Sequence, residues 1–255
     1  MKKIICSCLC VTGVMVLTRL VGGIIGSSVT GYFLQSVLAE LVGVILTVCA
    51  LLILKNTSIM KFKLQGVGEG LKACSPLLVL SVVIMLGYLG KHDPVTESSL
   101  NIVLFVLHMF LVGIYEEVLF RGIIQNAFHD YFGCETADSV RKGIIMAGVV
   151  FGATHLTNIF GGGEIVPVII QAITVIPVGI LFGTIYYRSN RNIWLCILLH
   201  AWNDFGALLR SGILSGGGSA ISSINGYSGL KLISVLLYAS ILFVVMRKSK
   251  LRKMA

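Results

Sequence analysis

The amino-acid sequence predicts an all-α membrane protein, a polytopic bundle of about eight transmembrane helices. Of its 255 residues, 56% are hydrophobic and only 12% are charged, and the mean hydropathy is +0.95. The apolar residues come in long unbroken runs, unlike the alternating pattern of a membrane β-barrel. Only helices and closed barrels satisfy the backbone hydrogen bonds in lipid, so these runs indicate helices.

Eight apolar runs follow one another along the chain. Each is close to the length that crosses a bilayer as a helix, and the fourth is longer than one crossing needs. The first follows Lys2 and Lys3, and we interpret it as a retained helix because no clean signal-peptide cleavage site comes after it. The predicted runs are Ile4–Ile25, Tyr32–Leu54, Ala73–Gly90, Leu100–Tyr131, Gly143–Phe160, Ile165–Tyr187, Ile193–Leu209 and Leu230–Met246.

The runs divide the chain into three regions. Residues 1–98 hold the first three predicted helices, residues 99–210 hold helices four to seven, and residues 211–255 hold a loop, the last helix and a basic tail. The loop, from Ser211 to Ser228, is rich in Gly and Ser and is expected to be flexible. No internal repeat and no separate soluble domain is visible in the sequence.

The distribution of Lys and Arg predicts the orientation of the bundle. With eight spans both termini lie on one side, and most basic residues fall in the segments on that side. The other side holds Lys91 and Arg210, with Lys231 at the edge of the last span. We therefore expect an integral, multi-pass protein of the cell membrane with both termini in the cytoplasm. The basic residues expected inside are Lys2, Lys3, Lys55, Lys61, Lys63, Lys72, Arg141, Lys142, Arg188, Arg191, Arg247, Lys248, Lys250, Arg252 and Lys253.

Charge and cysteine content exclude several classes of function. The formal net charge of +9 is explained by topology and by anionic lipid headgroups. We therefore expect membrane lipids as partners and no nucleic acid. The seven cysteines are odd in number and contain no CxxC pair. They indicate neither a disulfide framework nor a cysteine-based zinc site.

The fourth run carries three ionisable residues where lipid-facing side chains would be apolar. Glu116 and Glu117 are adjacent, and Arg121 follows Glu117 by four residues, so Glu117 and Arg121 share a helical face and can pair. Each charged group costs about 2.5–3.5 kcal/mol on insertion scales and usually faces the protein interior. A helix end with one snorkelling Arg would not explain the paired acids, so these residues indicate a functional site.

Two further polar groups lie within apolar runs. Phe151 precedes His155 by four residues in the fifth run, and His200 precedes Asp204 by four in the seventh, beside Asn203. We expect these groups to meet Glu116 in one cavity open to the cytoplasm. The remaining intramembrane polar residues receive simpler interpretations. Arg19 either snorkels or faces the bundle, with snorkelling favoured, and Glu40 is a lone acid within its run. His108 is expected to be a packed histidine, since no partner is spaced to meet it.

This set of residues favours hydrolysis by an activated water. Glu116 and His155 can serve as a base pair for water attack on a carbonyl, and His200 with Asn203 and Asp204 can stabilise the oxyanion. No Ser or Cys stands beside a base, so covalent catalysis is weakly supported. A zinc ion held by Glu116, His155 and His200 remains an alternative, although the spacing is not HExxH. A proton-coupled transporter would also use buried Glu and His, but no paired half-repeat is visible.

The three motifs, EExxxR from Glu116 to Arg121, FxxxH from Phe151 to His155 and HxxxD from His200 to Asp204, resemble those of the CPBP intramembrane proteases. This family includes the type II CAAX prenyl endopeptidases and the Abi bacteriocin-processing and immunity proteins. The resemblance covers about Leu100 to Leu209. It implies that Glu116 and His155 activate water, that His200 and Asp204 form the oxyanion hole, and that Glu117 and Arg121 support the geometry. No cofactor is expected, and zinc is the alternative.

One residue departs from the pattern of the family. Asp204 stands where the prenyl-protein branch commonly has Asn, and an ionised carboxylate cannot donate a hydrogen bond to an oxyanion. Either Asp204 is protonated, or it orients His200, or Asn203 supplies the donor. The resemblance implies a peptide or protein substrate, lipidated or not, cleaved near its C-terminus or leader. A non-proteolytic membrane scaffold or an immunity protein of the same fold is the alternative.

Overall fold

The computed structural model describes residues 1–90, 95, 97–214 and 220–251, and these contain helices and loops without a strand. The predicted tail residues Arg252 and Lys253, and Lys91 of the opposite side, lie outside the described residues. Six helical segments are long and apolar enough to cross a membrane, which confirms an all-α polytopic membrane bundle. The six segments are α1 (Lys2–Ser27), α2 (Tyr32–Ile53), α3 (Val67–Leu89), Ser99–Phe132, Ala137–Gly161 and α7 (Ile165–Arg188).

Two of these segments change their helical type along their length. The fourth consists of α4 (Ser99–Glu117), the π-helical η2 (Val118–Gln125) and α5 (Asn126–Phe132). Its 34 residues confirm the long fourth run. The fifth consists of α6 (Ala137–Thr154) and the 3₁₀-helical η3 (His155–Gly161). π-helical turns are rare and occur frequently at functional sites, and here η2 begins directly after Glu116 and Glu117.

The seventh and eighth predicted runs form shorter helices. These are α8 (Ile193–Leu209), which the π-helical η4 (Arg210–Leu214) continues, and η5 (Gly229–Leu232) with α10 (Ile233–Val245). The Gly/Ser-rich segment predicted as a loop is partly helical, in η4, which packs Ile213 and Leu214 into one cluster with Phe105, and in α9 (Ala220–Asn225). Its residues 215–219 lie outside the described residues. The remaining short elements are η1 (Thr57–Met60) and α11 (Lys248–Leu251).

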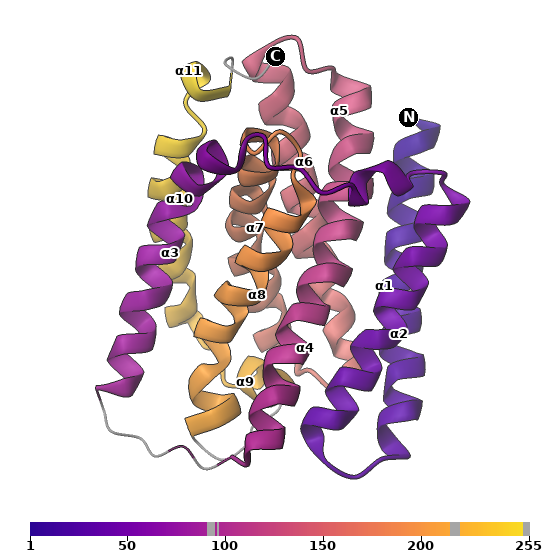
Figure 1. The fold of residues 1–255 in the computed structure, drawn as a ribbon, viewed down its shortest axis with the longest axis vertical. Coiled ribbons are helices and arrows are strands. Elements are labelled where there is room, and N and C mark those ends of the chain that lie inside the picture. Colours follow the sequence, from indigo (N-terminus) through magenta and orange to yellow (C-terminus); the bar gives the residue numbers. More distant parts are fainter. Residues whose placement is uncertain (91–94, 96, 215–219, 252–255) are drawn as a thin grey trace.

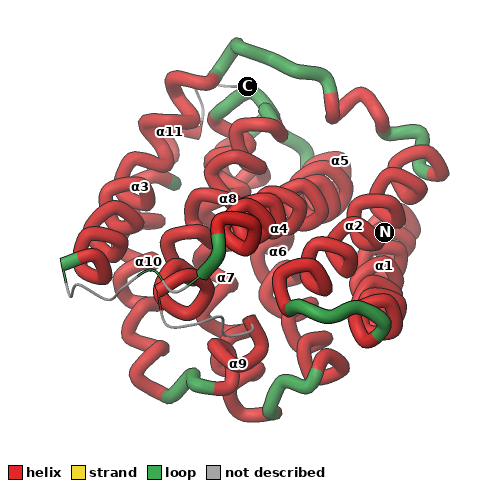
Figure 2. The backbone as a smooth tube through the Cα atoms, turned by 60° about the horizontal axis from the view of Figure 1, so that its bottom comes forward, coloured by secondary structure: helices red, strands yellow, loops and turns green. Residues whose placement is uncertain are grey.

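Helices α4 and α8 lie in the middle of the bundle (Figures 1 and 2). The α1–α2 pair packs against α4 on one side, and α3 packs against α8 on the other. The start of α1, the connector between α2 and α3, and α11 lie at the same end of the bundle (Figure 1). This arrangement agrees with an even number of crossings.

Glycines let the central helices approach closely. A Cβ added at Gly113 of α4 would lie 2.8 Å from the carbonyl oxygen of Ile197 in α8. Between α6 and α7, a Cβ at Gly152 of α6 would lie 2.6 Å from the carbonyl oxygen of Ala172. Both distances are too short for a real side chain, so the backbones touch where the sequence places glycine.

Candidate functional site

The imidazole of His200 is the centre of the buried polar cluster. Its Nδ1 lies 2.6 Å from Glu117 Oε1, and its Nε2 lies 3.3 Å from Asp204 Oδ2 and 3.6 Å from Glu116 Oε2. Three carboxylates, two from α4 and one from α8, therefore surround one ring. The close approach at Gly113 makes this possible, because it brings the last turn of α4 against the middle of α8.

Glu117 also bridges to Arg121, as their spacing predicted. Glu117 Oε2 lies 3.0 Å from Arg121 Nε, and both side chains are 0% exposed. The guanidinium lies over the ring of Phe151, 4.9 Å from its centroid, and over that of Phe182 at 5.6 Å. Within the described chain its nitrogens have no hydrogen-bond partner, so the carboxylate and the two ring faces are what offset the buried charge.

His155 lies at the junction where α6 ends and η3 begins. Its Nδ1 lies 2.8 Å from the carbonyl oxygen of Phe151, and its ring meets the Phe151 ring edge to face at 4.7 Å. A carbonyl oxygen only accepts, so Nδ1 carries the proton and Nε2 of the neutral ring is an acceptor. The Phe151 ring also lies 6.4 Å from the His200 ring, so this phenylalanine stands next to both imidazoles.

The predicted residues thus divide into two groups. Direct contacts join Glu116, Glu117, Arg121, His200 and Asp204, and Asn203 Nδ2 donates to Asp204 Oδ1 at 3.2 Å. His155 is linked to that group through Phe151. In the described structure no hydrogen bond or ion pair joins His155 to Glu116 or to His200.

A second polar cluster lies next to the first. Arg19 faces the bundle, with Nη1 3.7 Å from Glu40 Oε1, so snorkelling, the favoured of its two interpretations, is wrong. His108 is buried and packed, as expected, and its Nε2 lies 4.0 Å from the same oxygen, a neighbour that the sequence did not predict. Each residue belongs to a different helix, α1, α2 and α4, so spacing within one helix could not reveal the contacts. Glu116 interacts electrostatically with both Arg19 and Glu40.

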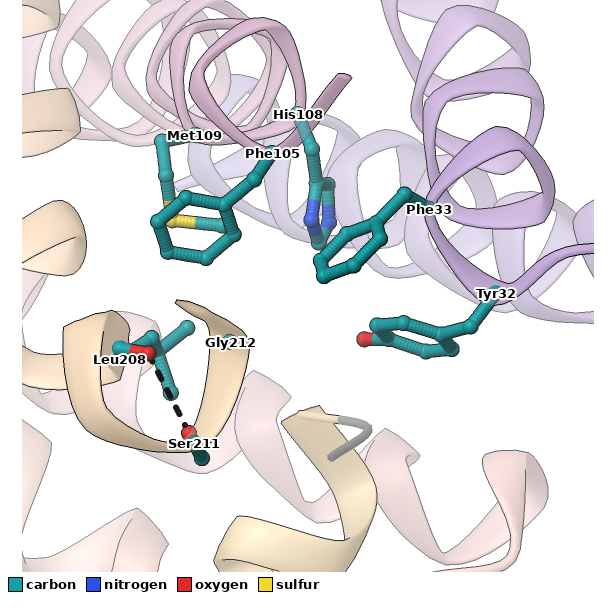
Figure 3. A pocket seen from close by; sticks show the side chains of 8 residues that line it. All are labelled: Tyr32, Phe33, Phe105, His108, Met109, Leu208, Ser211 and Gly212. Atoms are coloured by element: carbon teal, nitrogen blue, oxygen red, sulfur yellow. Dashed lines mark hydrogen bonds between the residues drawn. The ribbon is translucent and has the colours of Figure 1, made fainter. Parts of the chain in front are cut away.

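His108 also lines a small cavity beside residues 105–109 of α4, toward the start of the helix from Glu116. Figure 3 shows its imidazole projecting into this space near the rings of Phe105 and Phe33. The cavity volume is about 10 Å³, close to what a single water needs. A second cavity of about 430 Å³ lies at the other end of the bundle. Neither cavity is lined by Glu116, His155 or His200, so the cytosol-facing cavity around them stays a prediction.

The residues named for a zinc alternative do not form a preformed metal site. The described residues contain no group of three or more His, Cys, Asp or Glu that could hold one ion. Both nitrogens of His200 face carboxylates, and Nδ1 of His155 faces a backbone carbonyl. Zinc needs nitrogen ligands at about 2.0–2.1 Å around a common point, which this arrangement does not offer.

These observations define an integral membrane helix bundle with a buried cluster of carboxylates and imidazoles. Residues 98–206 match a family model described as type II CAAX prenyl endopeptidase Rce1-like. The matched region contains all three motifs, and it confirms the resemblance to the CPBP proteases. Because the matched family is one of endopeptidases, the comparison supports a membrane protease. No curated protein and no solved structure matches the chain.

Proposed function

We propose that the protein is an intramembrane endopeptidase that hydrolyses peptide bonds near the C-terminus or leader of membrane-associated substrates. The observation that carries the proposal is the convergence of Glu116, Glu117 and Asp204 on His200 within the region that matches the endopeptidase model. The substrate is a peptide or protein, with or without an attached lipid, that reaches the site from the cytoplasmic face.

In the proposed reaction Glu116 and His155 activate the attacking water. The Nε2 acceptor of His155 and the Glu116 carboxylate both take hydrogen bonds from the water, and Glu116 takes its proton. The water oxygen bonds to the carbonyl carbon and gives a tetrahedral oxyanion. When the C–N bond breaks, the proton passes from Glu116 to the leaving amine.

His200 and Asn203 stabilise the oxyanion in this scheme. An imidazole that donates from both nitrogens to carboxylates carries a positive charge that can stabilise the oxyanion, and Asn203 can donate a second amide hydrogen beyond the one given to Asp204. Asp204 then orients His200, which is one of the roles that the sequence left open. Glu117, held by Arg121, fixes the ring from the other side.

The test uses purified protein in lipid nanodiscs and a panel of prenylated tails, bacteriocin leaders and signalling peptides, with mass spectrometry as the readout. Glu116→Gln and His155→Gln should abolish cleavage. His129→Gln is the matched control, since His129 is a buried imidazole of α5 without contact to the cluster, and it should retain cleavage. Chelator should leave the rate unchanged.

Three outcomes would count against the proposal. Turnover retained in both variants would show that Glu116 and His155 do not activate the water. Full biological activity in cells from variants that are inactive on every peptide would favour the scaffold or immunity alternative. Proton-dependent flux in liposomes would favour a transporter.

A further inference from the structure

A large polar cavity lies at the end of the bundle where α1 begins, away from the proposed catalytic cluster. Its volume is about 430 Å³, within the range of small-molecule sites. It is built from four parts of the chain: the first turns of α1, the connector after α2, the η2–α5 segment and the turn between α7 and α8. The connector crosses this end of the bundle (Figure 1). We call it the basic pocket.

The lining of the basic pocket carries an excess of positive charge. Lys3, Lys55, Lys63 and Arg191 line it, against the single carboxylate of Asp130. Asp130 is already paired with Lys3 at 2.5 Å. Within the described chain the ammonium groups of Lys55 and Lys63 make no ion pair or hydrogen bond, and the guanidinium of Arg191 reaches only Cys134 Sγ at 3.7 Å. Three cations therefore face one cavity without a compensating anion.

The backbone around the basic pocket is strained. Three non-glycine residues in the described structure have positive φ, and two of them, Lys55 (φ 51°) and Arg191 (φ 56°), line the pocket. Lys55 follows the end of α2, a position that glycine usually occupies for this conformation. Strained residues persist where surrounding structure or function holds them. Here the chain keeps a cation at each strained position.

We propose that the basic pocket binds the phosphate of an anionic lipid headgroup. A phosphate presents several oxygens and can meet several cations from different segments at once. Apolar residues close in the chain to lining residues are exposed: Ile53, directly before the lining Leu54, is 79% exposed, and Leu9, two residues after the lining Ser7, is 69% exposed. Acyl chains can lie on such side chains, which favours a lipid over free phosphate, although both share the phosphate chemistry. The inference does not rest on the proposed peptidase activity.

The test measures lipid retention by native mass spectrometry of the full chain in detergent. Phosphatidylglycerol, zwitterionic phosphatidylcholine and inorganic phosphate are titrated in separate arms. Lys55→Gly combined with Lys63→Gln should weaken phosphatidylglycerol binding about twenty-five-fold, since each cation near an anionic lipid contributes about a factor of five. Lys61→Gln is the matched control, because Lys61 lies in the same connector and does not line the pocket. It should change binding by less than about twofold.

Lys55→Gly also separates lost binding from lost folding. Glycine adopts positive φ without strain, so the melting temperature of this variant should be unchanged or raised while its lipid affinity falls. Binding of inorganic phosphate without any binding of phosphatidylglycerol would overturn the lipid and assign the pocket to free phosphate. Equal loss in Lys61→Gln, or equal retention of phosphatidylcholine, would overturn the proposal, since either result would mean unspecific surface attraction.

Discussion

His200 Nδ1 lies 2.6 Å from Glu117 Oε1, and this contact joins α8 to α4 at the centre of the bundle. The other oxygen of Glu117 lies 3.0 Å from Arg121 Nε. One buried carboxylate therefore connects an imidazole to a guanidinium. Because all three groups are removed from water, each depends on the others to offset its buried charge or polarity.

This dependence predicts strong coupling between Glu117 and Arg121. Arg121→Met leaves Glu117 without its cation and should lower the free energy of unfolding by about 3–5 kcal/mol, as breaking buried ion pairs does. Glu117→Gln should also destabilise. The double variant should lose less than the sum of the two single losses, because neither buried charge is then left alone. Equilibrium unfolding in mixed micelles measures all three.

The exposed ion pair between Lys72 and Glu69 provides the control. Its side chains are 72% and 47% exposed, so Lys72→Met should leave the unfolding transition unchanged. Simple additivity of Arg121→Met and Glu117→Gln would contradict a shared network.

Phe151 is predicted to position His155 as well as to pack. Its ring meets His155 at 4.7 Å and lies under the guanidinium of Arg121 at 4.9 Å. Phe151→Leu should therefore lower kcat for peptide cleavage in addition to costing on the order of 1–3 kcal/mol of stability. Phe120→Leu is the matched control, since Phe120 is fully buried and contacts Phe151 at 4.9 Å without reaching either polar group.

Both phenylalanine variants should melt at similar temperatures, and only Phe151→Leu should lose activity beyond what its stability explains. Comparison of kcat at a temperature where both proteins are folded decides the point. Equal kcat in the two variants would mean that Phe151 contributes only packing and does not position His155.

Gly113 is predicted to control the distance between α4 and α8. A Cβ there meets the carbonyl oxygen of Ile197 at 2.8 Å, so Gly113→Ala must separate the two helices and lengthen the contact between Glu117 and His200. We expect a loss of about 1–3 kcal/mol and a fall in cleavage rate. Gly87→Ala in α3 meets nothing within 4 Å and should leave stability equal or slightly raised. A Gly113→Ala protein with unchanged stability and activity would show that the helices are not in tight contact.

The parts of the cluster that were predictable from sequence are those that lie within one helix. Glu117 with Arg121 and His200 with Asp204 are each four residues apart, and both pairs are in contact. The apolar runs likewise predicted the bundle, because burial in lipid leaves few alternatives to helices.

Contacts between helices were not predictable in the same way. The meeting of Arg19, Glu40 and His108 requires α1, α2 and α4 to be packed at a particular rotation, and no spacing in the chain encodes that rotation. The change from α- to π-helix at Val118 and to 3₁₀-helix at His155 also has no signal in composition. The sequence did offer one clue to the cluster of Arg19, Glu40 and His108. Glu40 is an acid in an apolar run, and a buried carboxylate needs a partner.

Orientation in the membrane is the last prediction, and cysteine labelling tests it. The turn after α1 lies at the end of the bundle opposite the connector that carries Lys61 (Figure 1). Because the basic residues concentrate at the end of Lys61, that end should face the cytoplasm. In an otherwise cysteine-free protein, a membrane-impermeant maleimide applied to intact cells should label Ser28→Cys and should label Lys61→Cys only after permeabilisation. Both positions are exposed, so burial does not limit either reaction. Labelling of Lys61→Cys in intact cells would mean that the topology is the reverse of the predicted one, and that the basic pocket lies at the outer leaflet.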